Sequence, residues 1–237
     1  MKRSWLRLLA LLLTLALAGC SLPAAGGGEE PASANLPKKL LLLKKKEGSG
    51  DGLLVKRWEK QGYLVFEMSE NEFKADQTAG YAAIYVSESV NAARLDSGLT
   101  KLALPVVYAK PQLAGTSGVA EMQGYGQLEG VSKVAIRQMK HPLAAGLTEQ
   151  PAVYQSAGKL NYAVPSKEAV VIAAAADDEK KAVLFAYEKG SRNALDQPVP
   201  ARQVFVFLPT GDEANLTEDG WKLLDAALAW AVQNPTK

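Results

Sequence analysis

The apolar pattern near the start of the expected folded region changes from a continuous run to helical spacing. Lys39–Lys44 contains four consecutive leucines, a run typical of a strand that is buried on both faces. Leu54, Val55 and Trp58 then recur at helical spacing, and Gly62 follows as a natural helix end. This segment therefore predicts a buried strand followed by an amphipathic helix.

Three further apolar runs predict strands, and a short helix is expected over Asn91–Leu99. The three strands are Tyr63–Met68, Tyr81–Val86 and Pro105–Ala109. Strands that alternate with helices favour a parallel sheet with right-handed crossovers.

The second half of the chain has a different pattern, with few helical residues between its apolar runs. Four strands are predicted there: Val131–Gln138, Ala169–Ala175, Ala182–Tyr187 and Gln203–Leu208. The middle two flank the polar turn 177–179 and predict an antiparallel hairpin. An apolar stripe over Thr217–Val232 predicts a closing helix. The expected fold class is α/β, a three-layer sandwich with a mainly parallel sheet and a late antiparallel β-hairpin excursion.

The first residues of the chain carry a pattern of a different kind. A basic start is followed by an apolar run, Leu8–Leu17, which is about half of the roughly 20 residues that span a bilayer. A charged start, a short apolar region and small residues at a cut site together describe a secretory signal. The run ends in Leu17-Ala18-Gly19-Cys20, which resembles the lipobox of bacterial lipoproteins.

That resemblance implies cleavage before Cys20 and attachment of lipid to it. The alternatives are an uncleaved membrane anchor and an ordinary core cysteine; the short apolar run disfavours the first, and Gly19 with the polar tail after Cys20 disfavours the second. We therefore expect the chain to consist of three segments: a signal peptide over 1–19, a lipidated cysteine with a flexible tether over 20–37, and one α/β domain over 38–235. The expected location is the extracytoplasmic face of a cell membrane or outer membrane.

Charge and composition exclude several classes of function. Cleavage would remove three of the 27 basic residues and none of the 25 acidic ones, which changes the formal charge from +2 to −1. A near-neutral mature chain has no electrostatic footprint for nucleic acid. With one cysteine and one histidine, the chain offers no intramolecular disulfide and no thiolate or histidine-rich metal site. No metal and no cofactor is expected.

Four segments in order resemble the class I glutamine amidotransferase-like superfamily, and within it the ThuA-like branch. They are the strand 81–86 with Ser87-Glu88-Ser89-Val90, the strand 105–109, the turn His141-Pro142-Leu143-Ala144-Ala145-Gly146-Leu147, and Leu216-Thr217-Glu218-Asp219-Gly220-Trp221 after the last strand. The resemblance implies a flavodoxin-like sheet with its functional groups at the carboxyl ends of the strands.

The chain departs from this superfamily at the catalytic positions. Amidotransferases of this fold carry a cysteine on a sharp turn after a strand and a His–Glu pair before the last helix. In this chain the stretch after the strand is Tyr108-Ala109-Lys110-Pro111, which has no cysteine. The stretch before the last helix is Leu208-Pro209-Thr210-Gly211-Asp212, which has no histidine. The Cys-His-Glu triad is absent, so glutamine hydrolysis is excluded and a non-catalytic domain, a pseudoenzyme, is favoured.

The best candidate ligand contacts are Ser87, Glu88 and Ser89, which follow a strand whose carboxyl end should open onto the ligand crevice. The simpler interpretation is a helix N-cap at Ser89. The G-x-S-x-G elbow that a serine nucleophile requires is missing. Ser87 and Glu88, with His141, are therefore only weak catalytic candidates. For His141, the only histidine, a structural ring-to-backbone hydrogen bond is the favoured role.

Basic residues add a second group of candidates, because Lys44-Lys45-Lys46 and Lys110 both follow strands expected to be parallel. They would line one rim of the sheet beside Glu88 and suit an anionic or sugar-acid ligand, although a solvated charge run is the simpler interpretation. The glycine-rich turn 48–52 lacks phosphate-loop spacing, and Asp51 is expected to cap the following helix. The acidic turn 177–179 is expected to be solvated rather than a cation site.

Two functional hypotheses remain. The first is a membrane-anchored extracytoplasmic lipoprotein with a non-catalytic ligand-binding or scaffolding domain. The second is a hydrolase-like enzyme that acts on a carbohydrate-type small molecule through Ser87, Glu88 and His141. The expected partners are the membrane, through the N-terminal lipid, a saccharide or small anionic ligand, and an envelope protein.

Overall fold

The computed structural model describes residues 38–46 and 50–233 of the 237-residue chain. All of them belong to one compact unit. The expected signal peptide, Cys20 and the tether lie outside the described residues. Within those residues, no helix is long and apolar enough to cross a membrane.

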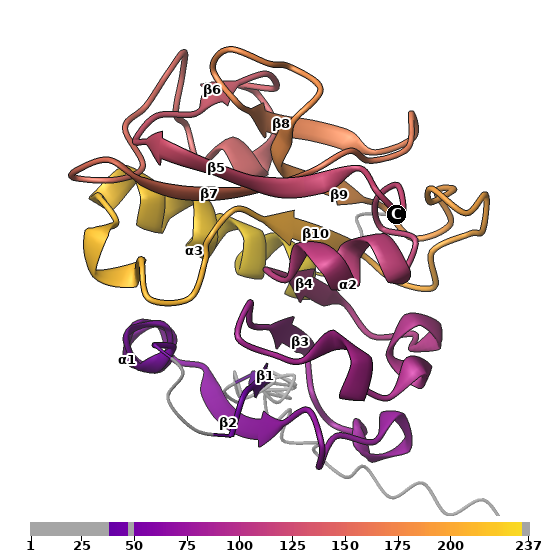
Figure 1. Ribbon diagram of the computed structural model, residues 1–237. Helices are drawn as coiled ribbons and strands as arrows, with labels where there is room; N and C mark the ends of the chain where they lie inside the picture. Colours follow the sequence, from indigo (N-terminus) through magenta and orange to yellow (C-terminus); the bar gives the residue numbers. More distant parts are fainter. Residues whose placement is uncertain (1–37, 47–49, 234–237) are drawn as a thin grey trace, which may run out of the picture. The chain divides into compact units, whose positions relative to one another are not determined.

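A ten-stranded mixed sheet forms the centre of the domain (Figure 1). Five parallel strands lie in the order β2-β1-β3-β4-β10, and their bounds are Leu64–Ser69, Lys39–Lys44, Ala83–Val86, Val106–Tyr108 and Gln203–Val206. Strand β1 pairs on both sides, with β2 and with β3, so the order of succession reverses between β1 and β3. This is the flavodoxin-like order, and it confirms the expected fold class.

The four leucines of β1 supply both faces of the sheet. Leu40 and Leu42 join one buried apolar cluster, and Leu41 and Leu43 join the other. Successive side chains of a strand point to opposite faces. A strand that is covered on both sides therefore carries a continuous apolar run.

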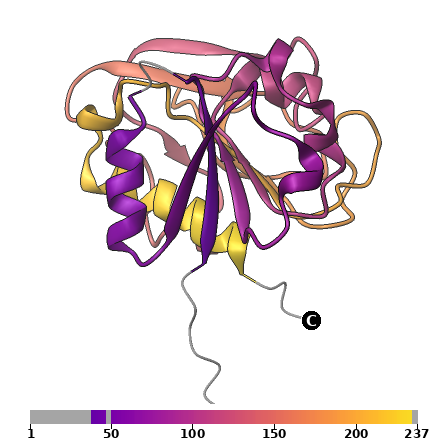
Figure 2. The same cartoon turned by 90° about the horizontal axis from the view of Figure 1, so that it is seen from below.

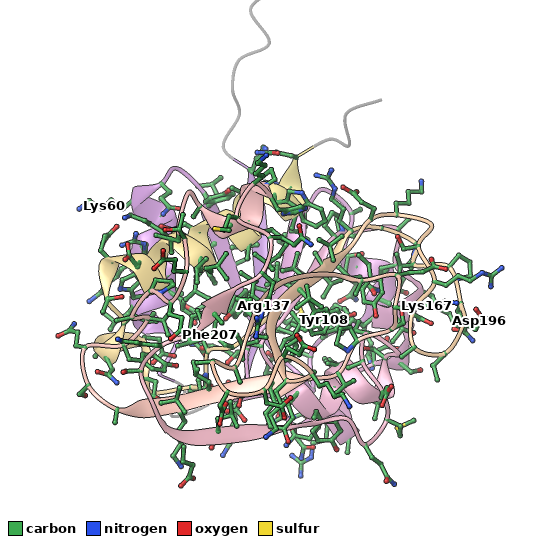
Figure 3. The ribbon with its side chains drawn as sticks, turned by 90° about the horizontal axis from the view of Figure 1, so that it is seen from above. Lys60, Tyr108, Arg137, Lys167, Asp196 and Phe207 are labelled. Carbon is green, nitrogen blue, oxygen red and sulfur yellow. The ribbon has the colours of Figure 1, made fainter. Side chains whose placement is uncertain are left out.

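Helices cover the two faces unequally (Figure 2). Helices α1 (Gly52–Lys60) and α3 (Glu218–Val232) pack on the face of Leu40 and Leu42. The other face is covered by the short helix α2 (Pro111–Thr116) and by 3₁₀ turns, of which Leu99 is a buried member. Figure 3 shows Tyr108 and Phe207 inside the domain and Lys60, at the end of α1, on its outside.

The connection from β4 to β10 contains α2 and the five remaining strands, drawn mainly in pink and orange in Figure 1. They are β5 (Tyr125–Val131), β6 (Ala135–Ile136), β7 (Gly158–Ala163), β8 (Val170–Ala174) and β9 (Ala182–Tyr187). Strands β8 and β9 pair antiparallel, which confirms the expected hairpin, and β9 continues the sheet antiparallel to β10.

Two predicted elements are wrong. Asn91–Leu99 is not one helix but two 3₁₀ turns, Ala92–Arg94 and Ser97–Lys101. The backbone is extended at Leu95, and the Asp96 carboxylate accepts from the Gly98 N–H, so a local turn replaces the helix. The predicted strand Val131–Gln138 is reduced to the end of β5 and the two residues of β6.

The first turn of α3 is held against the loop before β7. Thr217 caps the helix by accepting from the Gly220 N–H at 3.1 Å, and its hydroxyl donates to the Ala152 carbonyl at 2.6 Å. A Cβ atom on Gly220 would lie 2.3 Å from the Val153 carbonyl oxygen. Only glycine fits at this approach of helix to loop.

We expect Gly220→Ala to destabilise the protein by about 1–3 kcal/mol, because the helix must move away from Val153. Gly52→Ala is the matched control: Gly52 opens α1, and its added Cβ would meet nothing within 4 Å. Urea unfolding should show this control to be neutral or stabilised by up to about 1 kcal/mol. Equal effects of the two substitutions would contradict the close approach.

Candidate functional site

A cleft of about 730 Å³ opens at the carboxyl edge of the parallel sheet. Residues after four neighbouring strands line it: Lys45 after β1, Glu70 after β2, Ser89, Val90, Asn91, Ala92, Ala93 and Arg94 after β3, and Lys110 and Gln112 after β4. Its volume is within the range of small-molecule sites. It lies where open α/β sheets bind ligands, beside the point where the strand order reverses.

Ser89 joins the ends of the two strands at this reversal point. Its hydroxyl oxygen accepts from the Lys45 N–H at 3.1 Å, and its own N–H donates to the Ser87 hydroxyl at 3.0 Å. The loops after β1 and β3 are thus held together at the cleft. Ser89 belongs to no helix, so its expected role as a helix N-cap is wrong.

The cations of the cleft differ in their partners. The Lys110 ammonium lies 3.1 Å from the Glu88 carboxylate in a partly exposed ion pair. Among the residues that the structure describes, Lys45 and Arg94 form no ion pair through their side chains. Arg94 is positioned by a 3₁₀ turn in which the Ala93 N–H donates to the Asn91 side chain. Lys45 and Lys110 line the same rim, as the strand directions predict.

Ser87 lies beneath the cleft rather than in its lining. It is 1% exposed, and its hydroxyl donates to the Asp51 carboxylate at 2.8 Å. Asp51 is equally buried and does not cap α1 with its side chain, so the expected capping role is wrong. A buried carboxylate needs hydrogen-bond donors, and Ser87 supplies one of them.

The loop before α3 completes this buried polar network. The Thr210 hydroxyl lies 3.4 Å from that of Ser87, and the Glu213 carboxylate accepts from the Gly211 N–H at 2.8 Å. A Cβ on Gly50 would lie 3.0 Å from the Gly211 nitrogen, so the loops before α1 and α3 meet through two glycines. The network therefore joins the carboxyl ends of β1, β3 and β10.

Burial gives Glu213 an unusual titration. The side chain is 3% exposed, and its Oε1 has no hydrogen-bond partner among the described residues. Burial, together with the neighbouring Asp51 and Asp212, raises the pKa of Glu213 from its ordinary 4.5 to about 7, against two backbone hydrogen bonds that lower it. Burial also raises the pKa of Tyr85, which faces Asp51 and Glu213.

His141 lies at the opposite edge of the sheet from Ser87. Its Nδ1 accepts from the Leu143 N–H at 3.2 Å, and its ring centre is 5.7 Å from that of Trp230 in the last turn of α3. The Trp230 carbonyl accepts from Arg202, just before β10 begins. The ring-to-backbone hydrogen bond is the one expected from the sequence, and the structure does not bring His141 to Ser87 or Glu88. Burial lowers the pKa of His141.

The acidic turn between β8 and β9 is closed by its own neighbours. Asp178 accepts from the Lys180 N–H at 3.0 Å and lies 3.4 Å from the Lys181 ammonium. In the described part of the chain, no group of three or more acidic, histidine or cysteine side chains is arranged to hold a metal ion.

Several residues of the site carry no signal in the sequence pattern. Glu70 and Arg94 enter the cleft from loops, and Thr210 and Glu213 reach the network from a segment far along the chain. Asp51 was detectable only as a polar residue before a helix. The pairing of strand ends in space, rather than any local motif, brings these residues together.

Comparisons with known proteins support the fold. No protein-family model and no curated protein matches the chain. Among solved structures, SMU.1228c superposes with a TM-score of 0.53 at 10% identity, covering 82% of this chain and 100% of that chain. A putative GMP synthase subunit from Thermoplasma acidophilum superposes with a TM-score of 0.51 at 10% identity, covering 81% of this chain and 96% of that chain. The domain has a glutamine amidotransferase-like fold, and at these identities the likeness is one of fold alone.

The Glu213 carboxyl makes stability depend on pH. The folded protein keeps this proton up to about pH 7, whereas the unfolded chain releases it near pH 4.5. The stabilisation of the folded state by this bound proton is therefore complete below pH 4.5 and is lost as the pH rises from 4.5 to about 7. We expect Glu213→Gln, which stays neutral, to be more stable than the wild type by about 1–3 kcal/mol at pH 8 and to match it near pH 4.5.

Thermal unfolding between pH 4.5 and 8 measures this difference. Glu179→Gln is the control, because Glu179 is an exposed carboxylate in the β8–β9 turn. A Glu213→Gln advantage that does not change with pH would contradict the assignment.

Proposed function

We propose that this chain is a membrane-anchored extracytoplasmic lipoprotein whose domain binds a small anionic ligand in the carboxyl-edge cleft. The observation that carries the proposal is the cation pattern: Lys45 and Arg94 line the cleft without an ion-pair partner among the described residues. Ser89, Asn91 and Gln112 add polar groups to the same lining. Unpaired cations beside hydrogen-bonding groups suit a carboxylate, sulfate or phosphate.

The same geometry favours binding over catalysis. The Ser87 hydroxyl is buried on Asp51, and the Glu88 carboxylate is occupied by Lys110. Ala109, Lys110 and Pro111 follow β4 where the superfamily carries its nucleophile. A nucleophile needs access to its substrate, and the Ser87 side chain, at 1% exposed, does not have it. A pseudoenzyme that keeps the fold and the cleft fits these residues best.

Membrane attachment rests on the lipobox-like Leu17-Ala18-Gly19-Cys20. Lipidation in the manner of bacterial lipoproteins, with diacylglyceryl and palmitoyl chains on Cys20, would hold the domain outside the cytoplasm. Two or more acyl chains anchor a protein stably, whereas one chain binds only weakly and reversibly.

Anion binding is tested by thermal unfolding of the full chain, purified in detergent, with sulfate, phosphate, glucuronate and neutral glucose. A ligand at 100 times its dissociation constant stabilises the folded state by about 2.7 kcal/mol, a shift of several degrees for a domain of this size. We expect at least one anion to raise the unfolding temperature, and glucose to have no effect.

The double variant Lys45→Gln, Arg94→Gln should abolish the shift without altering the stability of the ligand-free protein, because neither side chain has an ion-pair partner among the described residues. Lys56→Gln with Lys60→Gln is the matched control on the exposed side of α1. Unfolding temperatures that no anion changes would refute ligand binding and favour the scaffolding alternative with an envelope protein.

Lipid attachment is tested by expressing the chain in a bacterium fed with labelled palmitate. We expect the wild type to carry the label and to sediment with membranes, and Cys20→Ser to lose both properties. Ser21→Ala changes the neighbouring residue and should retain both. A Cys20→Ser chain that still carries the label would show that the lipid is attached elsewhere.

A further inference from the structure

The carboxylate of Glu70 is the most unusual group in the cleft. The residue is 4% exposed, yet it lines the cleft, and its Oε2 has no hydrogen-bond partner among the described residues. A buried carboxylate oxygen without a donor is costly, and structures rarely keep one without a reason. Such a group is a candidate acceptor for a ligand.

The surroundings hold Glu70 in this place. The turn after β2 is closed by Glu72, whose carboxylate accepts from both the hydroxyl and the N–H of Ser69. Residue 70 follows directly, one position beyond the pairing of Lys44 with Ser69 at the ends of β1 and β2. Lys45 occupies the corresponding position after β1, but it forms no ion pair with Glu70. Both charges therefore remain available at the same end of the cleft.

The charges of the lining define the ligand further. Three cations and Glu70 line the cleft, and Glu88 offsets one of the cations, Lys110. Counted as formal charges, these groups leave one net positive charge, which a ligand with a single negative charge balances. A neutral sugar would leave this charge unbalanced, and so would a zwitterion.

On the basis of the proposed function, we infer that the cleft selects hydroxylated carboxylic acids, the class to which sugar acids belong. The ligand carboxylate binds the cations Lys45 and Arg94, and a ligand hydroxyl donates to Glu70. Hydrogen bonds to an ionised acceptor are among the strongest in proteins, so Glu70 discriminates against acids that lack a hydroxyl.

The test compares two acids with a six-membered ring and one negative charge, D-glucuronate and cyclohexanecarboxylate, by calorimetric titration of the full chain in detergent. We expect glucuronate to bind about tenfold or more tightly. Glu70→Gln and Glu70→Met should weaken glucuronate binding and leave cyclohexanecarboxylate binding unchanged or stronger, because a negative charge is removed. Glu59→Gln, an exposed acid on α1, is the control.

Folding is monitored at the same time. Because Glu70 has no partner for its Oε2 among the described residues, both variants should unfold at the same or a higher temperature than the wild type without ligand. This measurement separates a binding role from a structural one, since loss of a structural group would lower the unfolding temperature.

The remaining outcomes are distinct. Equal affinity for the two acids, or a preference for glucuronate that survives in both Glu70 variants, overturns the inference while anion binding stands. Tighter binding of L-serine than of glucuronate overturns it in favour of zwitterions. If sulfate, phosphate and both acids all fail to bind, the proposed function itself is refuted.

Discussion

The hydrogen bond from Ser87 to Asp51 holds together the part of the molecule on which the cleft depends. It joins the residue after β3 to the residue before α1, at the point where the strand order reverses. Both groups are buried, so the bond to the charged acceptor is stronger than an exposed one and its loss would be costly. Ser89 donates to Ser87 and accepts from the Lys45 backbone. These two bonds connect the cleft lining to the buried Ser87–Asp51 pair. Ser87 thus links the segment before α1 to the loop after β3, and through Ser89 to the loop after β1.

Four of the five parallel strands, β1, β3, β4 and β10, could be predicted because they are buried on both faces. The leucines of Lys39–Lys44 must be apolar at every position, so the run is visible without any knowledge of its neighbours. Strand β5 has no such run: it lies at the edge of the sheet, is partly exposed along its length and contains a register shift between Glu129 and Val131. The prediction of a helix over Asn91–Leu99 is wrong for a local reason, because the Asp96 carboxylate accepts a hydrogen bond from the Gly98 N–H. Helical spacing cannot reveal that competition.

Of the candidate site, the sequence predicts only those features that follow from the direction of the strands. Parallel strands end at one edge, and this constraint places Lys45, Ser89 and Lys110 on the same rim. It gives no information on how far a side chain is buried, which is why Ser87 was expected in the lining and lies beneath it. Glu70 and Glu213 are ordinary polar residues in the sequence, and their burial follows from loops that pack against distant segments. A local pattern contains none of that tertiary information.

Two acids at the carboxyl edge differ in their partners: Glu70 lines the cleft, and Glu88 lies outside the lining but pairs with a residue of it. Glu88 pairs with Lys110, and a partly exposed ion pair of this kind contributes about 0–1 kcal/mol, so a ligand anion could replace Glu88 at little cost. Glu70 has no such partner among the described residues, and its position beside Lys45 leaves a negative and a positive group unneutralised within one cleft. A protein selected for stability alone would pair them or replace both with apolar residues. An acid and a base left unpaired among the described residues, in one cleft above a hydrogen-bonded network of buried side chains, are the features on which the proposed binding site rests.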